Sequence, residues 1–237
     1  MTASPYAAPA GYEALTVLHG HSIVRVVAQQ PLAATVRTAM DAMTLHEFAA
    51  RTPGARALAG RGTAWAATLP DGTAIVVRHT RHGGLLAPFT RDLFLAPTRA
   101  PHELHVALRL TNAGVPTPVI AAYAIYPAIG PFVRSDVATH RLDGEVFPDA
   151  LRLAADGRRG ALLGAIARLL HALRRAGAHH PDLNVRNVFI TGEFGAPVAA
   201  VLDVDRVTFG ERGDARLAAM NLGRLLRSCT KAGLGLT

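Results

Sequence analysis

The interpretation of the chain is decided by one stretch of sequence, His179-His180-Pro181-Asp182-Leu183-Asn184-Val185-Arg186-Asn187. An apolar run over 187–191 follows it, then a turn rich in glycine and proline, then a second apolar run over 198–203. Two such runs joined by a short turn are expected to pair as a hairpin. The pairing would bring Asn187 and Asp203, sixteen residues apart in sequence, side by side at the open end of the hairpin.

These residue types suit phosphoryl transfer. That reaction needs a carboxylate that orients the acceptor hydroxyl, and oxygen ligands that hold Mg²⁺ against nucleotide phosphates. Asp182 can serve as the first, and Asn187 and Asp203 as the second; an Asp followed by four residues and an Asn is the spacing of kinase catalytic loops. The alternative is that Asp182 and Asn184 cap a turn while Asp203 merely ends a strand. Agreement among three motif elements and the strand pattern favours the catalytic interpretation.

The order of expected elements extends outward from this stretch. Strands are predicted over 21–28, 63–69, 73–79, 119–126 and 132–140, with one helix over 101–112. The second half is predicted to be helical over 147–155, 158–176 and 213–228, around the inserted hairpin. The sequence thus predicts an α+β bilobal protein-kinase-like fold, with a flexible N-terminus (1–15), a β-rich, nucleotide-binding N-lobe (16–141) and a reduced helical C-lobe (142–237).

Length and composition limit the functional classes. The 237 residues allow two small lobes, and the longest apolar stretch, 119–133, is broken by proline and glycine and is too short to span a bilayer. No secretory signal pattern is visible, and Cys229 is a lone cysteine, so a cytoplasmic location is expected. The net charge of +8 comes almost wholly from arginine, because Lys231 is the only lysine. Nucleic acid, an anionic membrane and a phosphorylated glycolipid all fit that charge.

Further segments resemble those of the 3-deoxy-D-manno-octulosonic acid (Kdo) kinases of the lipopolysaccharide kinase family. They are Gly60-Arg61-Gly62-Thr63-Ala64-Trp65, Val77-Arg78-His79-Thr80-Arg81-His82-Gly83-Gly84-Leu85, Ala113-Gly114-Val115-Pro116-Thr117-Pro118, Leu202-Asp203-Val204-Asp205-Arg206 and Asn221-Leu222-Gly223-Arg224-Leu225-Leu226-Arg227-Ser228. The resemblance implies transfer of the γ-phosphate of ATP, with Mg²⁺, to the 4-hydroxyl of Kdo on lipid A. It also implies a peripheral location at the cytoplasmic face of a Gram-negative inner membrane, with Kdo-lipid A and the anionic membrane surface as partners and no nucleic acid.

Three residues form a candidate phosphate-binding turn. Gly60-Arg61-Gly62 precedes a strand and resembles a shortened glycine-rich loop, whose backbone N–H groups can approach phosphate oxygens because glycine has no Cβ. A turn with two glycines is also common without any ligand. The cofactor-binding role of Gly60, Arg61 and Gly62 is therefore a hypothesis that rests on their position ahead of the first hairpin.

Two charged residues complete the candidate nucleotide site. Arg78 stands at the strand position where protein kinases carry their phosphate-binding lysine, and Glu103 on the following helix is its expected ion-pair partner. Arginine neutralises phosphate as lysine does, but its planar fork has a different reach, which leaves open whether it fully replaces the lysine. The alternatives are a strand-end cation for Arg78 and an unrelated helix-face charge for Glu103.

Several expectations follow from what the sequence lacks. No Ala-Pro-Glu follows Asp203 and only thirty-four residues remain, which leaves no room for a long activation segment. Asp205 replaces the glycine of Asp-Phe-Gly and either assists metal or acceptor binding or pairs with Arg206. Another sugar, a small molecule or a protein remains possible as the acceptor, and so does a pseudokinase that acts as an anionic-lipid-binding scaffold. The number of Mg²⁺ ions and the oligomeric state stay open.

Basic residues outside the motif carry two further hypotheses. The cluster of Arg78, His79, Arg81 and His82, with Arg91 and Arg99, meets either the carboxylate of Kdo and the phosphates of lipid A or solvent alone. The C-terminal helix combines arginines and leucines, a pattern suited to docking on anionic lipid and equally to core packing. His180 is expected to be structural, with its imidazole bonded to backbone near Asp203, and the histidines show no zinc-site spacing.

Overall fold

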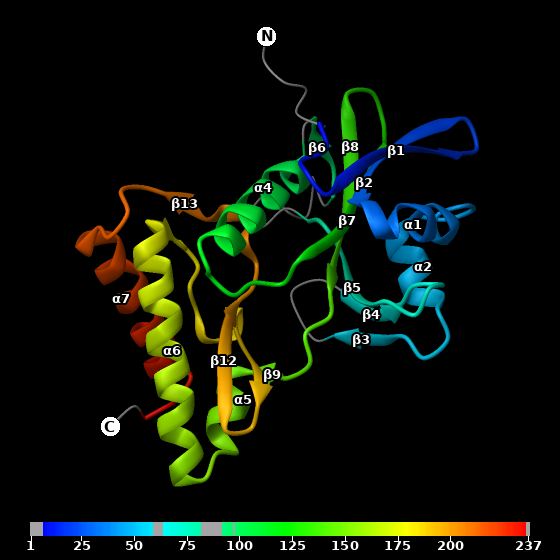
Figure 1. Ribbon diagram of the computed structural model, residues 1–237. Coiled ribbons are helices and arrows are strands. Elements are labelled where there is room, and N and C mark those ends of the chain that lie inside the picture. Colours follow the sequence, from blue (N-terminus) through cyan, green and yellow to red (C-terminus); the bar gives the residue numbers. More distant parts are fainter. Residues whose placement is uncertain (1–6, 59–63, 82–91, 97, 236–237) are drawn as a thin grey trace. The chain divides into compact units, whose positions relative to one another are not determined.

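The computed structural model describes residues 7–58, 64–81, 92–96 and 98–235, and the chain divides into two units (Figure 1). The first comprises Met1–His105 and Val119–Arg141, and the second comprises Val106–Pro118 and Leu142–Thr237. The chain passes finally into the second unit after Arg141, where the N-lobe was predicted to end. Residues 106–118, by contrast, pack with the second unit although they were assigned to the N-lobe.

An antiparallel sheet forms the first unit. Its strands run in the order β1-β2-β7-β8-β5-β4-β3, and β6 pairs with β8. The strands are β1 (Tyr12–His19), β2 (Ser22–Gln29), β3 (Arg56–Leu58), β4 (Ala64–Thr68), β5 (Ala74–His79), β6 (Phe94–Leu95), β7 (Ile120–Pro127) and β8 (Phe132–His140). The helices are α1 (Ala33–Ala39), α2 (Leu45–Arg51) and the first half of α4 (Arg99–Asn112), whose residues from Val106 onward belong to the second unit; a 3₁₀ turn covers Gln30–Leu32. The predicted strands of this half are therefore present, and β1, β3, β6, α1 and α2 are additional.

The turn between β4 and β5 is formed by the predicted Asp-Gly pair. Asp71 accepts a hydrogen bond from the backbone N–H of Thr73 at 2.9 Å, and Gly72 takes φ +90°, a conformation that glycine adopts without strain. The turn sets the register in which Arg78 lies opposite Ala64.

One face of this sheet carries the core of the first unit. Met40 and Leu45, from the α1–α2 region, are fully buried together with Ile75 and Val77 of β5. Trp65 of β4 packs against the same cluster. Alternation along β5 places Ile75, Val77 and His79 on this face and leaves Arg78 on the other.

The prediction of a flexible N-terminus over 1–15 is wrong from Tyr12 onward, because Tyr12–His19 is a full partner of β2. The Tyr12 hydroxyl donates to the carbonyl of Ile120 at 2.6 Å, and Leu15 is buried in the core. Its buried and exposed positions alternate irregularly, so the sequence pattern alone did not indicate a strand.

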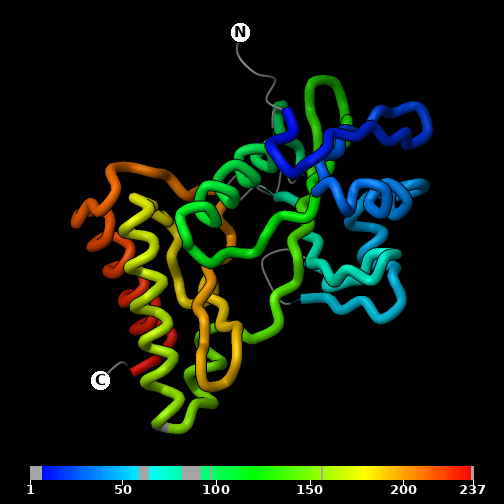
Figure 2. The backbone as a smooth tube through the Cα atoms, in the orientation of Figure 1, coloured from blue at the N-terminus to red at the C-terminus, as the bar shows by residue number. Residues whose placement is uncertain are grey.

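Helices and a small sheet form the second unit. The elements are α5 (Phe147–Arg152), α6 (Asp156–Ala176), α7 (Ala215–Lys231), β9 (Glu145–Val146), β10 (Ala178–His179), β11 (Val188–Glu193), β12 (Ala196–Val201) and β13 (Thr208–Phe209), with 3₁₀ turns at Val185–Asn187 and Val204–Arg206. The sheet order is β12-β11-β9, and β10 pairs separately with β13. Figure 2 shows the β11–β12 hairpin beside α6, on the side away from α7.

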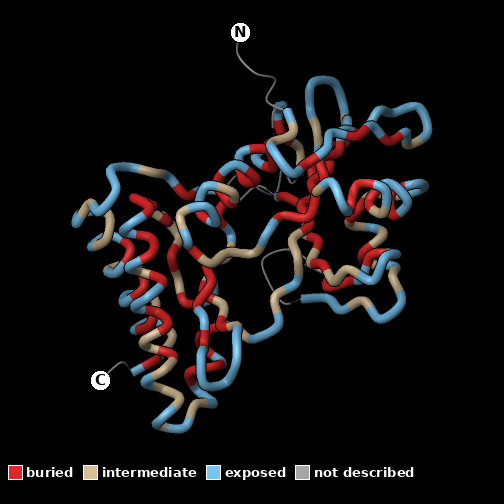
Figure 3. Tube along the Cα trace, in the orientation of Figure 1, coloured by how far each residue is buried: buried red, intermediate tan, exposed pale blue. Residues whose placement is uncertain are grey.

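The long helix α6 has the predicted apolar stripe and the predicted terminator. Leu162, Leu169 and Leu173 are buried on one side, and Figure 3 shows the buried and exposed sides along this helix. Gly177 ends it at φ +65°, where an added Cβ would lie 2.6 Å from the carbonyl oxygen of Gly210. Within the described ranges, no helix combines the length and the hydropathy needed to cross a bilayer.

Candidate functional site

His180 organises the loop between β10 and β11. Its ring Nε2 lies 3.0 Å from the carbonyl oxygen of Leu202, and its Nδ1 lies 3.2 Å from the backbone nitrogen of Asp182. The carbonyl can only accept and the backbone N–H can only donate, so Nε2 carries the hydrogen and the ring is neutral. Burial lowers the pKa of His180 and outweighs the opposing effect of the Leu202 carbonyl, in agreement with a neutral ring. The predicted structural role of His180 is confirmed.

Three carboxylates lie near this ring. The negative charges of Asp203, Asp182 and Asp205 all act on His180 and oppose the decrease in its pKa that burial causes. The fold therefore gathers residues from the catalytic loop and from the end of β12 around one buried imidazole. Asp182 is partly exposed and Asp203 is exposed, so both carboxylates are accessible from solvent.

Asn187 is held in place by both ends of its loop. Its Nδ2 donates to the carbonyl of Asp182 at 2.9 Å, and its backbone N–H donates to the side chain of Asn184 at 3.2 Å. The backbone N–H of Leu202 donates to the carbonyl of Asn187 at 2.8 Å, one step beyond the pair Val188↔Val201. The predicted hairpin is confirmed, and it places Asn187 opposite Leu202, next to Asp203.

Asp203 has an unusual backbone. Its φ of +57° is the only positive value among non-glycine residues in the part of the chain that the structure describes. This left-handed conformation is unfavourable for residues with a Cβ, and such strain is typical of functional positions. The bend separates β12 from the 3₁₀ turn Val204–Arg206 and exposes the carboxylate of Asp203.

The polar atoms left over at this site suit magnesium. Across the described ranges, no side chain or backbone group bonds to the carboxylates of Asp182 and Asp203 or to Oδ1 of Asn187. With Nδ2 of Asn187 engaged, its oxygen is the atom left for a ligand. Carboxylate and amide oxygens are the ligands that Mg²⁺ takes, so Asn187 and Asp203 fit the ion. Within the same described residues, no three His, Cys, Asp or Glu side chains gather into a metal-binding group.

Asn221 of α7 supports the loop and was not anticipated as a site residue. It is 1% exposed; its Oδ1 accepts from the backbone N–H of His180 at 3.0 Å, and its Nδ2 donates to the carbonyl of Ala178 at 2.8 Å. The signal in the sequence is a polar residue on the same helical stripe as Leu225 and Cys229, both of which are buried. A buried amide at such a position needs partners, and it finds them in the backbone of the catalytic loop.

The first unit holds the other predicted pair. Arg78 of β5 and Glu103 of α4 form an ion pair, as predicted, in which the Glu103 side chain is only 7% exposed. The contact fixes the guanidinium on the face of the sheet opposite the α1–α2 core. Contact of Arg78 with phosphate stays a prediction, and Gly60, Arg61 and Gly62 lie outside the described residues.

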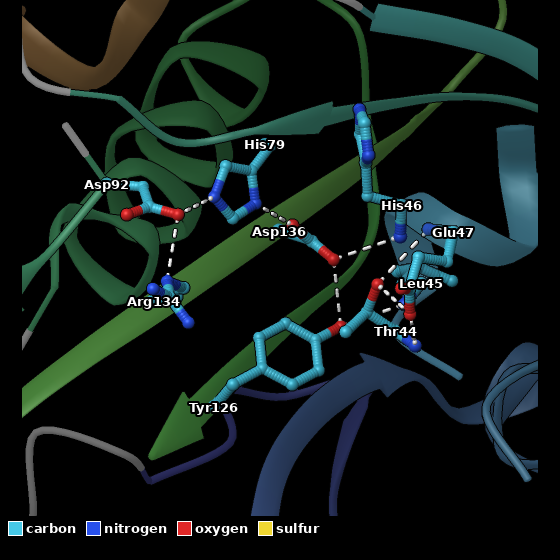
Figure 4. Close-up of polar contacts among 9 residues, drawn as sticks. All are labelled: Thr44, Leu45, His46, Glu47, His79, Asp92, Tyr126, Arg134 and Asp136. Carbon is cyan, nitrogen blue, oxygen red and sulfur yellow. Dashed lines mark hydrogen bonds and ion pairs between the residues drawn. The ribbon is translucent and has the colours of Figure 1, made fainter. Parts of the chain in front are cut away.

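A second polar cluster lies on the other face of β5 (Figure 4). Asp136 is fully buried and accepts hydrogen bonds from the backbone N–H of His46 at 2.9 Å and from the hydroxyl of Tyr126 at 2.9 Å. His79 lies between two carboxylates, with Nδ1 2.6 Å from Asp136 and Nε2 3.0 Å from Asp92. Both acceptors are carboxylate oxygens, so both ring nitrogens carry hydrogens and His79 is an imidazolium.

The pKa of His79 agrees with this assignment. Burial lowers it, but the hydrogen bonds and negative charges of Asp136 and Asp92 together raise it above its ordinary value. Arg134 also pairs with Asp92 at 2.8 Å. The positive charge of His79 is thus compensated by Asp136 and Asp92. His79 therefore does not contribute to the basic cluster that was predicted to meet substrate anions. His82 and Arg91 of that cluster lie outside the described residues.

The basic face of α7 is accessible. Arg216, Arg224 and Arg227 are exposed, and Leu222 and Leu226 are each 44% exposed. Leu225 is buried and belongs to the core instead. The core-packing interpretation is therefore confirmed for Leu225, and docking of the exposed residues on anionic lipid stays a prediction.

Comparisons with known proteins give independent information on the family of the chain. The model of the Lipopolysaccharide kinase (Kdo/WaaP) family matches residues 50–235. Similar curated proteins include the 3-deoxy-D-manno-octulosonic acid kinase of Vibrio vulnificus (strain YJ016), which is 32% identical over 178 residues that cover 73% of this chain and 71% of the relative. The enzyme of that name from Stenotrophomonas maltophilia (strain K279a) is 36% identical over 183 residues, covering 73% and 68%.

A solved structure, WaaP in complex with acyl carrier protein, matches with a TM-score of 0.57 at 21% identity and covers 90% of this chain and 83% of that one. This likeness confirms the predicted α+β kinase-like fold. The family match spans both the Arg78–Glu103 pair and the loop around His180. The chain therefore belongs to the lipopolysaccharide kinase (Kdo/WaaP) family and is a phosphotransferase of lipopolysaccharide biosynthesis.

Proposed function

We propose that the chain transfers the γ-phosphoryl group of ATP to the 4-hydroxyl of Kdo on lipid A. The observation that carries this proposal is the set of oxygen atoms around His180, from Asp182, Asn187 and Asp203, that no described residue occupies. The relatives named 3-deoxy-D-manno-octulosonic acid kinase support Kdo as the acceptor.

Each residue has a separate task in this reaction. Asp182 accepts a hydrogen bond from the acceptor hydroxyl, orients it and receives its proton as the new bond to phosphorus forms. The neutral ring of His180 holds the backbone of Asp182 and the end of β12 together. Asn187 and Asp203 would hold Mg²⁺ through their side-chain oxygens.

Charge neutralisation is the remaining requirement. A Mg²⁺ ion held by Asn187 and Asp203 would supply positive charge that offsets the negative charge on the transferring phosphoryl group. Arg78 carries the guanidinium that we assign to the nucleotide phosphates, and Glu103 limits its orientations. Alignment and neutralisation account for most of the catalysis of phosphoryl transfer, so no covalent enzyme intermediate is required.

We propose that the protein works as a peripheral protein at the cytoplasmic face of the inner membrane. Exposed arginines and leucines share the outer surface of α7, a combination that lets a helix lie on anionic lipid. The arrangement would hold the enzyme at the surface that carries its glycolipid substrate. Arg224→Gln together with Arg227→Gln should weaken sedimentation with anionic vesicles, and salt should weaken the native protein's binding in the same way.

Incubation of the full chain with labelled ATP, Mg²⁺ and Kdo-lipid A precursor tests the reaction, and nuclear magnetic resonance of the product identifies the phosphorylated hydroxyl. Asp182→Asn should lower kcat by at least about a hundredfold, since general-base assistance contributes ~10²–10⁴-fold. Asp149→Asn, an exposed carboxylate of α5, is the matched control and should leave kcat unchanged.

Three results would redirect the assignment. Full activity of Asp182→Asn would remove that residue from the reaction. Phosphate on heptose, on another hydroxyl, on a soluble small molecule or on a protein would keep the kinase and change its acceptor. If the native chain showed no Mg²⁺-dependent nucleotide binding, the protein would be assigned as a pseudokinase scaffold.

A further inference from the structure

The second unit contains a groove that the proposed reaction does not use. It has a volume of about 670 Å³ and lies between α6, the loop at Gly114 and Pro116, and β12. Its floor is apolar and includes Leu169 and Ala172 of α6, both buried, and Ala199 of β12. None of the candidate catalytic or metal-binding residues lines it.

Hydrogen bonds fix the walls of the groove. The backbone N–H of Val201 donates to the carbonyl of Pro116 at 2.9 Å, and Arg168 donates to the carbonyl of Pro197 at 3.0 Å. Pro197 itself has no N–H to offer. These contacts occupy both ends of the edge of β12, so addition of an extended strand to that edge is disfavoured and the side-chain surface is what remains for binding.

Two arginines and a histidine line one rim of the groove, and the arginines give it positive charge. Arg168, His171 and Arg175 follow one another at spacings of three and four residues, which places them on one face of α6. All three are exposed, and in the described part of the chain none forms an ion pair with a carboxylate. At ~1.5 Å of rise per residue the row is roughly 10 Å long, and no acidic residue lines the groove.

We propose that this groove binds an acidic amphipathic helix of a partner protein. A helix with carboxylates about two turns apart would match Arg168 and Arg175, with a polar group between them for the imidazole of His171, and its apolar side would cover Leu169 and Ala172. Charge complementarity selects an acidic partner over a neutral or basic one. The walls formed by β12 and the Pro116 loop make the surface concave, which suits a helix better than a flat bilayer.

A direct binding experiment on the full chain tests this surface. The probe is a fluorescein-labelled fifteen-residue helical peptide with leucines on one side and glutamates at matching spacings on the other. Fluorescence anisotropy should show binding that weakens with added salt, whereas the same peptide with lysine in place of glutamate should not bind. The double variant Arg168→Gln with Arg175→Gln should weaken peptide binding about tenfold, because each arginine loses an ion pair with the peptide that contributes ~0.7 kcal/mol.

A matched double variant separates the groove from general charge. Arg37→Gln with Arg51→Gln removes the same charge from exposed positions of the first unit and should bind like the native chain. Because Arg168 also bonds to Pro197, Arg175→Glu alone is the second groove variant, with Arg37→Glu as its control. Groove variants should keep phosphoryl transfer without the peptide, which separates this proposal from the proposed function.

The proposal is overturned if the glutamate peptide does not bind the native chain, or if groove and control variants lose affinity equally. It is also overturned if the groove variants lose affinity for anionic vesicles while peptide binding is unchanged, because the cations would then belong to a membrane-binding surface.

Discussion

Replacement of Asp136 with alanine should destabilise the first unit more than any surface change in it. The Asp136 carboxylate is fully buried and accepts hydrogen bonds from His79, the backbone of His46 and the hydroxyl of Tyr126 (Figure 4). Alanine would remove that shared acceptor and one of the two carboxylates that compensate the imidazolium. Breaking one side of a buried pair costs about 3–5 kcal/mol, a large share of the ~5–15 kcal/mol that folded domains have.

Trp65 makes the assay specific to this unit. It is the only tryptophan, and it packs against the core that covers β5. Its fluorescence during urea unfolding therefore reports on the unit that holds Asp136. Asp41→Asn, at an exposed position, is the matched control and should change the free energy of unfolding by less than about 0.5 kcal/mol.

The pH dependence gives an independent check. The pKa of His79 is raised above 6.5 in the folded chain, so its stabilising effect is complete below pH 6.5 and is lost as pH rises through the raised pKa. Without Asp136, burial opposes protonation with less compensation, so the difference between native and variant proteins should shrink toward high pH. A loss below about 1 kcal/mol at pH 6, or a constant difference from pH 6 to pH 9, would refute the assigned network.

Three further predictions concern the catalytic loop. Asn221→Leu removes the hydrogen bonds to His180 and Ala178. Urea titration should show a free energy of unfolding lower by about 1–3 kcal/mol, and kinetic assays should show a lower kcat. An unchanged kcat would mean that the loop holds its shape without the amide. The pKa of His180 is lowered from 6.5 by burial, so the stabilisation from its neutral ring is present above pH 6.5 and is lost as pH falls through the lowered pKa. Because protonation of His79 acts in the opposite sense, the quantity to measure is the difference in unfolding free energy between the native chain and His180→Gln, which should shrink from pH 8 to pH 5; a difference that does not change with pH would contradict this. Asn187→Ala should weaken Mg²⁺ binding, measured by titration in the presence of ATP, by about 10-fold or more, whereas Asn187→Asp should retain it; equal affinities in all three proteins would exclude Asn187 as a ligand.

Local patterns in the sequence were sufficient for the loop and the hairpin. Asp182 and Asn187 are close in sequence, and the two apolar runs after them pair with each other as adjacent strands. Such short-range contacts can be predicted from the order of residues alone. The Arg78–Glu103 pair was also accessible, because the strand and the helix that carry it both have clear periodicity. The roles assigned to these residues with ligands are still predictions.

Contacts between distant segments were not predictable in the same way. The Asp136 cluster joins residues 46, 79, 92, 126 and 136, and no local pattern indicates that a strand aspartate will be buried beneath a helix N-terminus. Tyr12–His19 was missed because its apolar residues alternate irregularly with alanine, threonine and glutamate, so its place in the sheet depends on β2. The α1–α2 region was missed because its short helices become stable only by covering the sheet.

The backbone conformation of Asp203 bears on which substitution would accumulate at this position if the activity were no longer under selection. Glycine there would relieve about 1 kcal/mol of left-handed strain and would lose a similar amount to greater freedom of the unfolded chain. Folding is therefore nearly indifferent to the exchange, and only the reaction retains the aspartate. A lineage that no longer needed the activity would lose this carboxylate early and without penalty, so a glycine at position 203 would be a readable mark of an abandoned enzyme.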